Sequence, residues 1–199
     1  MAVSPPPSKK EVLLNLLEKT SVVRVTAPSG TDIVLPVKGR QAHASTGLFR
    51  QKGQWGNLPT GEAYLAPLEG QSNGVVVVDG SMASVGMIGE PLRIKVEGGY
   101  ATEITGGPEA QKLIALLEPH GRDGRTVAEF GVGTNDKAIL TGIILEDEKV
   151  MGTIHIAFGD NKSMGGTVRV ASHLDGLIKR PTVWLDDRKI MEDGRLLVG

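Results

Sequence analysis

The sequence of 199 residues contains no cysteine, which excludes disulfide bonds, thiolate metal ligands and cysteine nucleophiles. Any metal site must therefore be built from imidazole and oxygen ligands. Aromatic residues are few, with three phenylalanines, two tryptophans and two tyrosines. The formal net charge is only -1, so the composition does not indicate nucleic acid or an anionic membrane surface as a partner.

Long apolar runs are also missing. The N-terminal segment has no apolar core of signal-peptide length, and no later run approaches the roughly 18 apolar residues of a membrane span. We therefore expect a cytoplasmic protein without a membrane partner. Glycine is abundant, at 27 residues, and it separates short apolar runs in the way that turns and bulges do.

Most of the chain has the pattern of short β-strands. Strand-like segments occupy residues 22–27, 32–37, 74–81, 92–100, 126–133, 152–159, 167–176 and 181–198. Only two short helices are predicted, one that begins at a capping-box pattern from Ser8 to Glu11 and one over residues 108–117. Because two helices provide few crossovers, we predict an α+β fold with a glycine-rich mixed or antiparallel sheet.

The chain is expected to divide into an N-terminal lead-in with a short helix, residues 1–20, and one larger domain, residues 21–199. Residues 38–67 form an irregular segment rich in glycine, glutamine and other polar residues. We expect a long loop here, because such a segment in a compact domain is usually functional or disordered.

Three glutamates stand in apolar or glycine-flanked surroundings, where an ionised carboxylate needs a partner: Glu62, Glu129 and Glu148. The simpler interpretation of Glu62 is a loop residue. Glu146, Asp147 and Glu148 form an acidic run, which is typical of a solvated turn. His43 and His120 lie in polar, glycine-containing segments and are given no role.

The stretch from Gly152 to Gly176 contains His155, His173 and Asp175. In an extended strand His173 and Asp175 project to the same face, because side chains alternate with period two. Together with the glutamates they offer the ligands that Zn²⁺, Co²⁺, Mn²⁺ or Fe²⁺ binds. The spacing is not that of a compact metal motif, so a satisfied strand-end histidine and a turn aspartate remain alternatives.

Six blocks in one order make a resemblance specific: GTDIVLPVKGR, NLPTGEAYLAPLEG, VVVVDGS, AEFGVGTN, EDEKVMGTIHIAFGDN and SHLDG. From about Glu18 to Gly199 the chain resembles the C-terminal part of the aminopeptidase T/S metallopeptidases. The resemblance implies a co-catalytic pair of divalent metals, a small peptide substrate and the fold of that C-terminal domain.

The same resemblance implies the ligands residue by residue. Glu62 matches the glutamate of the N-x-P-x-x-E block, and Glu129 that of the A-E block. His155 matches the histidine of the H-I-A block, and His173 and Asp175 match the H-x-D pair. A glutamate of the family also activates the metal-bound water or bridges the ions, a role that falls to Glu62 or Glu129.

One position departs from that family. Its tyrosine ligand follows the H-I-A histidine closely, whereas this chain has GDNKSMGG there, and its only tyrosines are Tyr64 and Tyr100. We therefore predict that Lys162 approaches the position of the tyrosine oxygen. An ammonium group has no lone pair, so it would repel a cation.

These observations favour a metal-dependent hydrolase of aminopeptidase type, using Zn, Co or Mn. A distant branch with a similar domain contains iron-dependent dioxygenases that open dihydroxypyridine rings, and His155, His173 and Asp175 would supply their facial triad, with Fe(II) as cofactor and a small molecule as substrate. A third alternative is a non-catalytic binding domain. We also expect a homodimer or larger assembly, because an exposed sheet edge is commonly buried by self-association.

Overall fold

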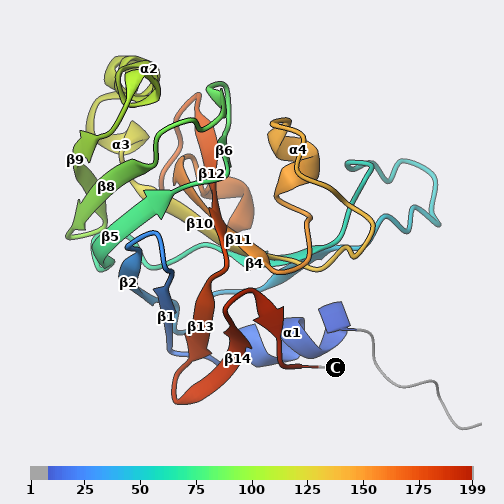
Figure 1. Ribbon diagram of the computed structural model, residues 1–199. Helices are drawn as coiled ribbons and strands as arrows, with labels where there is room; N and C mark the ends of the chain where they lie inside the picture. The colour runs from blue at the N-terminus through green and yellow to red at the C-terminus, as the bar shows by residue number, and fades with distance from the viewer. Residues whose placement is uncertain (1–8, 199) are drawn as a thin grey trace, which may run out of the picture.

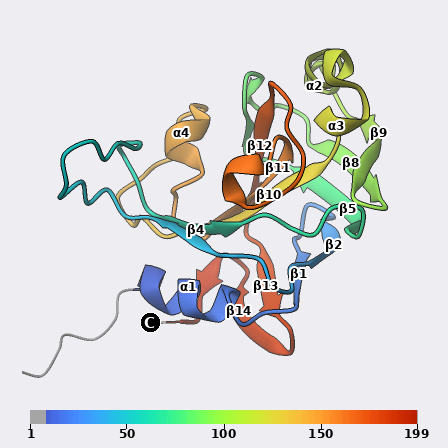
Figure 2. The same ribbon diagram turned by 180° about the vertical axis from the view of Figure 1, so that it is seen from behind.

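The computed structural model describes residues 9–198 and consists of two antiparallel sheets with few helices (Figures 1 and 2). The first sheet has eight strands in the order β15-β14-β13-β1-β2-β5-β8-β9. In chain order these strands are β1 (Val22–Thr26), β2 (Asp32–Pro36), β5 (Asn73–Val78), β8 (Leu92–Glu97), β9 (Tyr100–Thr105), β13 (Thr182–Leu185), β14 (Arg188–Glu192) and β15 (Arg195–Leu196).

The second sheet has seven strands in the order β3-β4-β10-β11-β12-β6-β7. In chain order these are β3 (His43–Ser45), β4 (Glu62–Leu65), β6 (Ser81–Met82), β7 (Gly86–Met87), β10 (Val127–Gly133), β11 (Thr153–Gly159) and β12 (His173–Lys179). All strand pairs in both sheets are antiparallel, so the α+β prediction is confirmed.

The two sheets differ in how they bury their faces. Strand β8 buries Leu92, Ile94 and Val96 and exposes the residues between them, which is the pattern of a sheet with one wet face. Strands β10 and β11 are instead buried at all seven positions each. Their apolar face joins the core with Phe130 and Phe158, and the opposite face carries the polar residues of the candidate site.

Within residues 9–198, four α-helices lie around the sheets: α1 (Lys9–Leu17), α2 (Pro108–Leu117), α3 (Gly121–Gly124) and α4 (Ile144–Asp147). The two longer helices agree with the predicted ones, and α1 packs on β4 and β3. Short 3-10 turns occupy Glu118–His120 and Lys162–Met164. Ser8, the first residue of the expected capping box, lies outside the described residues. No helix in the described part of the chain has the length and apolarity to cross a membrane.

Two sequence expectations need correction. The segment 38–67 is not one loop, because it contains β3 and β4, and Glu62 is therefore a buried strand residue. The strand expected over residues 167–176 begins only at His173. The preceding segment contains no strand and is held by polar contacts, in which the Asp160 and Asn161 side chains accept the backbone N–H groups of Val170 and Val168.

Candidate metal centre

Four neighbouring strands bring the sequence-predicted ligands onto one face of the second sheet. Strand β4 carries Glu62, β10 carries Glu129, β11 carries His155, and β12 carries His173 and Asp175. The register pairs Glu129 with Ala157 and Ala157 with Asp175, and it pairs His155 with Gly131, all on this face. Antiparallel pairing thus assembles residues that lie more than a hundred positions apart in the chain.

Gly131 makes room for the His155 ring. A Cβ atom at position 131 would lie 2.0 Å from His155 Nε2, a distance that no pair of unbonded atoms tolerates. The imidazole therefore lies directly against the β10 backbone at Gly131, fully buried, and its Nε2 faces the carboxylates. This glycine is required by close packing, since the backbone φ there is not in the left-handed region.

Glu129 contacts both histidines. His155 Nε2 lies 3.1 Å from Glu129 Oε1, and His173 Nε2 lies 3.1 Å from Glu129 Oε2. Burial by itself raises the pKa of Glu129, but the hydrogen bonds and charges of the two histidines outweigh it and lower that pKa to about 2. The carboxylate is therefore ionised across the neutral range, which suits a bridging or ligating group better than a base.

A buried ammonium group also belongs to the site. Lys149 is 1% exposed, and its Nζ donates to Glu62 Oε1 at 2.6 Å and to the carboxylate of Glu148. Burial lowers the pKa of Lys149, but the charges of Glu62 and Glu148 outweigh this and raise it. Lys149 cannot be recognised from the sequence, because only its contact with a strand 87 residues away shows that it is buried.

The acidic run is not a solvated turn, and this expectation was wrong. Asp147 and Glu148 are 0% and 6% exposed. The Asp147 carboxylate accepts from the Ser81 hydroxyl at 2.6 Å and from the N–H groups of Thr141 and Gly142 at 2.7 and 2.9 Å, which fixes α4 beside the site. Burial raises the pKa of Glu148 to about 7.

The histidine rings differ in how they are held. His173 Nδ1 donates to the Asp160 carbonyl at 2.7 Å, and in the metal-free protein its Nε2–H points at Glu129 Oε2 and Asp175 Oδ1, 3.1 and 3.5 Å away. The buried Nδ1 of His155 has no hydrogen-bond partner among residues 9–198, and its Nε2 lies 3.6 Å from Glu62 Oε2. The His173 ring is therefore held at both nitrogens, whereas the His155 ring is held by the carboxylates around Nε2 alone.

The charges and donors of the site fit a divalent metal ion. Four buried or largely buried carboxylates face one ammonium group, which leaves an excess of three negative charges when the histidines are neutral: Glu62, Glu129, Glu148 and Asp175. Two groups of three residues each bring ligand atoms within 4.8 Å of one another. They are Glu62–Glu148–His155 and Glu129–His173–Asp175. Imidazole with carboxylate suits Fe, Mn, Co and Zn.

The two histidines consequently fall into different groups. The triad of His155, His173 and Asp175 is not among the groups that the described residues form, since Glu129 lies between the two rings. Lys162 is also not where the sequence predicted it: its side chain is exposed and does not line the site. The prediction for Lys162 is therefore wrong, and the ammonium group at the site belongs to Lys149.

We call Glu129–His173–Asp175 the outer group, because its His173 is the most exposed of these ligands, and Glu62–Glu148–His155 the interior group. A cavity of about 540 Å³ is lined by residues of both groups. Glu129, His173 and Asp175 form its floor together with Glu62, Glu148 and Lys149, and Trp55 and Tyr64 also line it. Tyr64 follows Glu62 by two residues on β4, a spacing that could have placed it at the site from the sequence. Burial, then the charges of Glu129 and Glu62, raise the Tyr64 pKa, so its hydroxyl is a hydrogen-bond donor at neutral pH.

Replacing Gly131 by Ala should displace the His155 ring from Glu129, because the added methyl group needs the space of Nε2. We expect a loss of about 1–3 kcal/mol in unfolding free energy, measured by urea denaturation. Gly89→Ala is the matched control, since a Cβ at that exposed position meets only an ordinary contact at 3.9 Å. Equal stability of the two variants would contradict this packing.

Replacing Lys149 by Met should leave the Glu62 and Glu148 charges buried without a cation. The expected cost is about 3–5 kcal/mol in unfolding free energy at pH 7, measured by urea denaturation. The control Lys162→Met removes the same charge from an exposed position and should change stability by less than about 0.5 kcal/mol. A Lys149→Met protein as stable as the control would show that the ammonium does not neutralise these carboxylates.

Metal binding should release protons. Burial lowers the pKa of both histidines, but hydrogen bonds to the surrounding carboxylates outweigh it and raise the pKa of His155 to about 9 and of His173 to about 11. Both rings are thus protonated at pH 7 in the metal-free protein, and a ligating ring must lose that proton. Calorimetry in buffers of different ionisation enthalpy should show release of one to about two protons per metal ion, and affinity that rises with pH. Binding without proton release would contradict the raised pKa values.

Two solved structures share this fold. The structure of 2,5-dihydroxypyridine dioxygenase from Pseudomonas putida KT2440 matches with a TM-score of 0.88 at 22% identity, over 96% of this chain and 59% of that chain. Wild-type AmpT from Thermus thermophilus matches with a TM-score of 0.73 at 24% identity, over 94% of this chain and 53% of that chain. The expected similarity of fold to thermophilic aminopeptidases is therefore confirmed.

Sequence comparison decides between the families. A curated 2,5-dihydroxypyridine 5,6-dioxygenase from Pseudomonas putida KT2440 is 24% identical over 206 residues, which cover 94% of this chain and 57% of the relative. The chain thus spans little more than half the length of these relatives. The NicX model of 2,5-dihydroxypyridine 5,6-dioxygenases matches residues 4–198. The aminopeptidase interpretation is therefore wrong, since AmpT is a distant structural neighbour, and this chain belongs to the NicX dioxygenase family.

Proposed function

We propose that this chain carries the metal centre of a dioxygenase that opens a dihydroxylated pyridine ring, with Fe(II) as the metal. The observation that carries the proposal is the match of the family model over residues 4–198, together with the group Glu129–His173–Asp175 at the floor of a cavity. When bound, Fe(II) supplies the one-electron chemistry that allows O₂ to react with an aromatic ring.

The outer group is the better candidate for the iron. Lys149 already neutralises Glu62 and Glu148 of the interior group, whereas no lysine or arginine forms an ion pair with the outer group among residues 9–198. His173 is also 30% exposed on its side chain, so the outer group can be reached from the cavity. His155 would then not bind the iron itself, and its Nε2 would hold Glu129 in place.

The chain's own residues would bind the substrate and move its protons. Glu148 lines the same cavity, and with a pKa of about 7 it can exchange a proton with a substrate hydroxyl near neutral pH. The Tyr64 hydroxyl is available as a hydrogen-bond donor on the same side. Ring opening by a dioxygenase breaks one ring bond and places both atoms of O₂ in the product, so no external reductant is required.

The test is reconstitution of the full chain with Fe(II) without oxygen, followed by addition of 2,5-dihydroxypyridine and O₂. We expect one O₂ consumed per ring opened, measured by an oxygen electrode and by loss of ring absorbance, and no uptake with Zn²⁺, which has no redox chemistry. His173→Ala should weaken metal binding by more than about 100-fold and abolish uptake. His120→Ala, which changes a histidine outside the site, should retain both.

The outcomes separate the alternatives. An iron-loaded chain that leaves dihydroxypyridines intact contradicts the proposed activity. A chain that binds no divalent metal at all contradicts the metal centre and favours a non-catalytic binding domain.

A further inference from the structure

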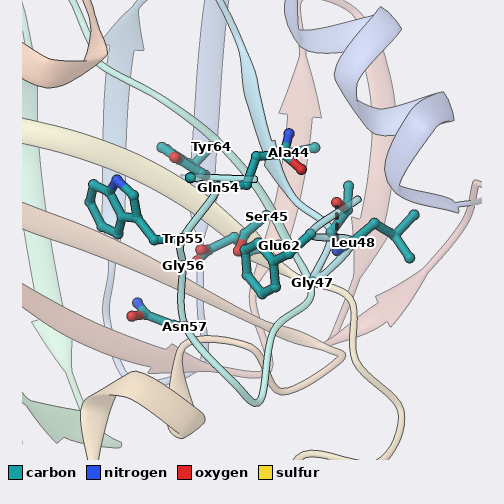
Figure 3. A pocket seen from close by; sticks show the side chains of 13 residues that line it. Ala44, Ser45, Gly47, Leu48, Gln54, Trp55, Gly56, Asn57, Glu62 and Tyr64 are labelled. Carbon is teal, nitrogen blue, oxygen red and sulfur yellow. Dashed lines mark hydrogen bonds between the residues drawn. The ribbon is translucent and has the colours of Figure 1, made fainter. Parts of the chain in front are cut away.

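Trp55 is an exposed aromatic residue beside the candidate centre. It lies in the loop of residues 46–61, between β3 and β4, and its side chain is 90% exposed. Figure 3 shows this loop, with Trp55 and Leu48 projecting to opposite sides. Exposing a large indole to water is unfavourable, so a ligand that covered this side chain would gain free energy from the contact.

The loop is held by its own contacts. At its tip, Gln54 Oε1 accepts the backbone N–H groups of Arg50 and Gln51 at 2.8 and 2.9 Å. At its base, the hydroxyls of Ser45 and Thr60 lie 2.5 Å apart. These features are typical of an Ω-loop, a compact segment whose ends lie close together. Trp55 is therefore presented on an organised support.

Close packing inside the loop adds to this support. A Cβ atom at Gly56 would lie 2.8 Å from the Phe49 ring, so that ring rests directly on the backbone next to Trp55. The two ends of the loop contain Gly47 and Gly61, with φ of 68° and 134°, and residues with a side chain rarely adopt these conformations. The chain can therefore turn sharply at both ends of the loop, where it leaves β3 and enters β4 beside the site.

Trp55 lines two adjoining cavities. One, of about 470 Å³, is lined by the loop together with Glu62 and Tyr64 (Figure 3). The other is the cavity over Glu129, His173 and Asp175. The indole thus stands where the space enclosed by the loop meets the space over the metal centre.

The cavity over the centre has apolar walls and a charged floor. Ile144 and Leu145 of α4 line it as well as Trp55, and Leu145 is 51% exposed. In Figures 1 and 2 the loop and α4 project from the same side of the second sheet. A flat ring with hydroxyl groups at its edge matches this arrangement, because its faces are apolar and its edge can bond to the carboxylates and Lys149.

We propose that Trp55 is the residue that binds the substrate ring by stacking and covers it from water. The inference rests on the proposed function for the identity of the ring, a dihydroxylated pyridine. Trp55 is then a substrate-positioning residue that contacts the ring face, while the hydroxyl groups contact the floor. Aromatic pairs of this kind contribute beyond the area that they bury.

Fluorescence tests the inference directly, because the chain has only two tryptophans. Trp184 lies on β13 in the other sheet, between Arg24 and Lys189, and can be replaced by Phe. In the Trp184→Phe protein loaded with Zn²⁺, 2,5-dihydroxypyridine should quench Trp55 emission saturably. Bound 2,5-dihydroxypyridine should also lower the rate constant for quenching of Trp55 emission by acrylamide several-fold.

Kinetics provides the second measurement. With Fe(II), Trp55→Ala should raise KM about tenfold with a smaller change in kcat, and Trp55→Phe should restore KM to within about threefold of the wild type. Leu48→Ala is the matched control, since Leu48 is 58% exposed on the same loop but does not line the cavity over the centre. It should leave KM unchanged. Equal effects of the two alanine variants would overturn the role of Trp55.

Failure of the inference and failure of the proposed function are distinguishable by calorimetry. Heat of dihydroxypyridine binding without any change in Trp55 emission overturns the inference and leaves the function intact. Absence of binding heat overturns both. A Trp55 emission that shifts with protein concentration, and not with ligand, overturns the inference in favour of a contact between two copies of the chain.

Discussion

The Glu129 carboxylate is the group on which the candidate centre depends, because it joins two histidines from two different strands. One oxygen contacts His155 and the other contacts His173, each at 3.1 Å. The interior group around Lys149 and the outer group at the cavity are thereby coupled through a single side chain. Any cation bound at the outer group competes with the histidine protons for the same carboxylate oxygens.

The fold supplies this arrangement through register and small residues. Adjacent antiparallel strands place Glu62, Glu129, His155 and Asp175 on one face, and Gly131 leaves space for an imidazole against the backbone. Lys149 balances part of the buried negative charge from the interior. Once the two histidines lose their protons, an excess of negative charge remains, which is the condition under which a protein binds a divalent cation.

Much of the fold could be predicted from the sequence, whereas the site could be predicted only in part. Strand β8 was found because its apolar residues alternate, and α2 because its proline and apolar period are local signals. The shared face of His173 and Asp175 follows from spacing, and apolar surroundings single out the glutamates, but the assignment of these residues to one centre rests on a family resemblance. The burial of Lys149 and of Asp147 depends on contacts distant in sequence. The ligand set is also compatible with hydrolysis and with dioxygen chemistry, so residue types could not choose between them.

Location of the metal is the most direct test of the account. Crystals of the full chain grown with Fe(II) without oxygen should be measured at the iron absorption edge. We expect one anomalous peak per chain, within bonding distance of Glu129, His173 and Asp175, with Lys149 still paired to Glu62. A single peak enclosed by Glu62, Glu148 and His155, or no peak at either group, would contradict it.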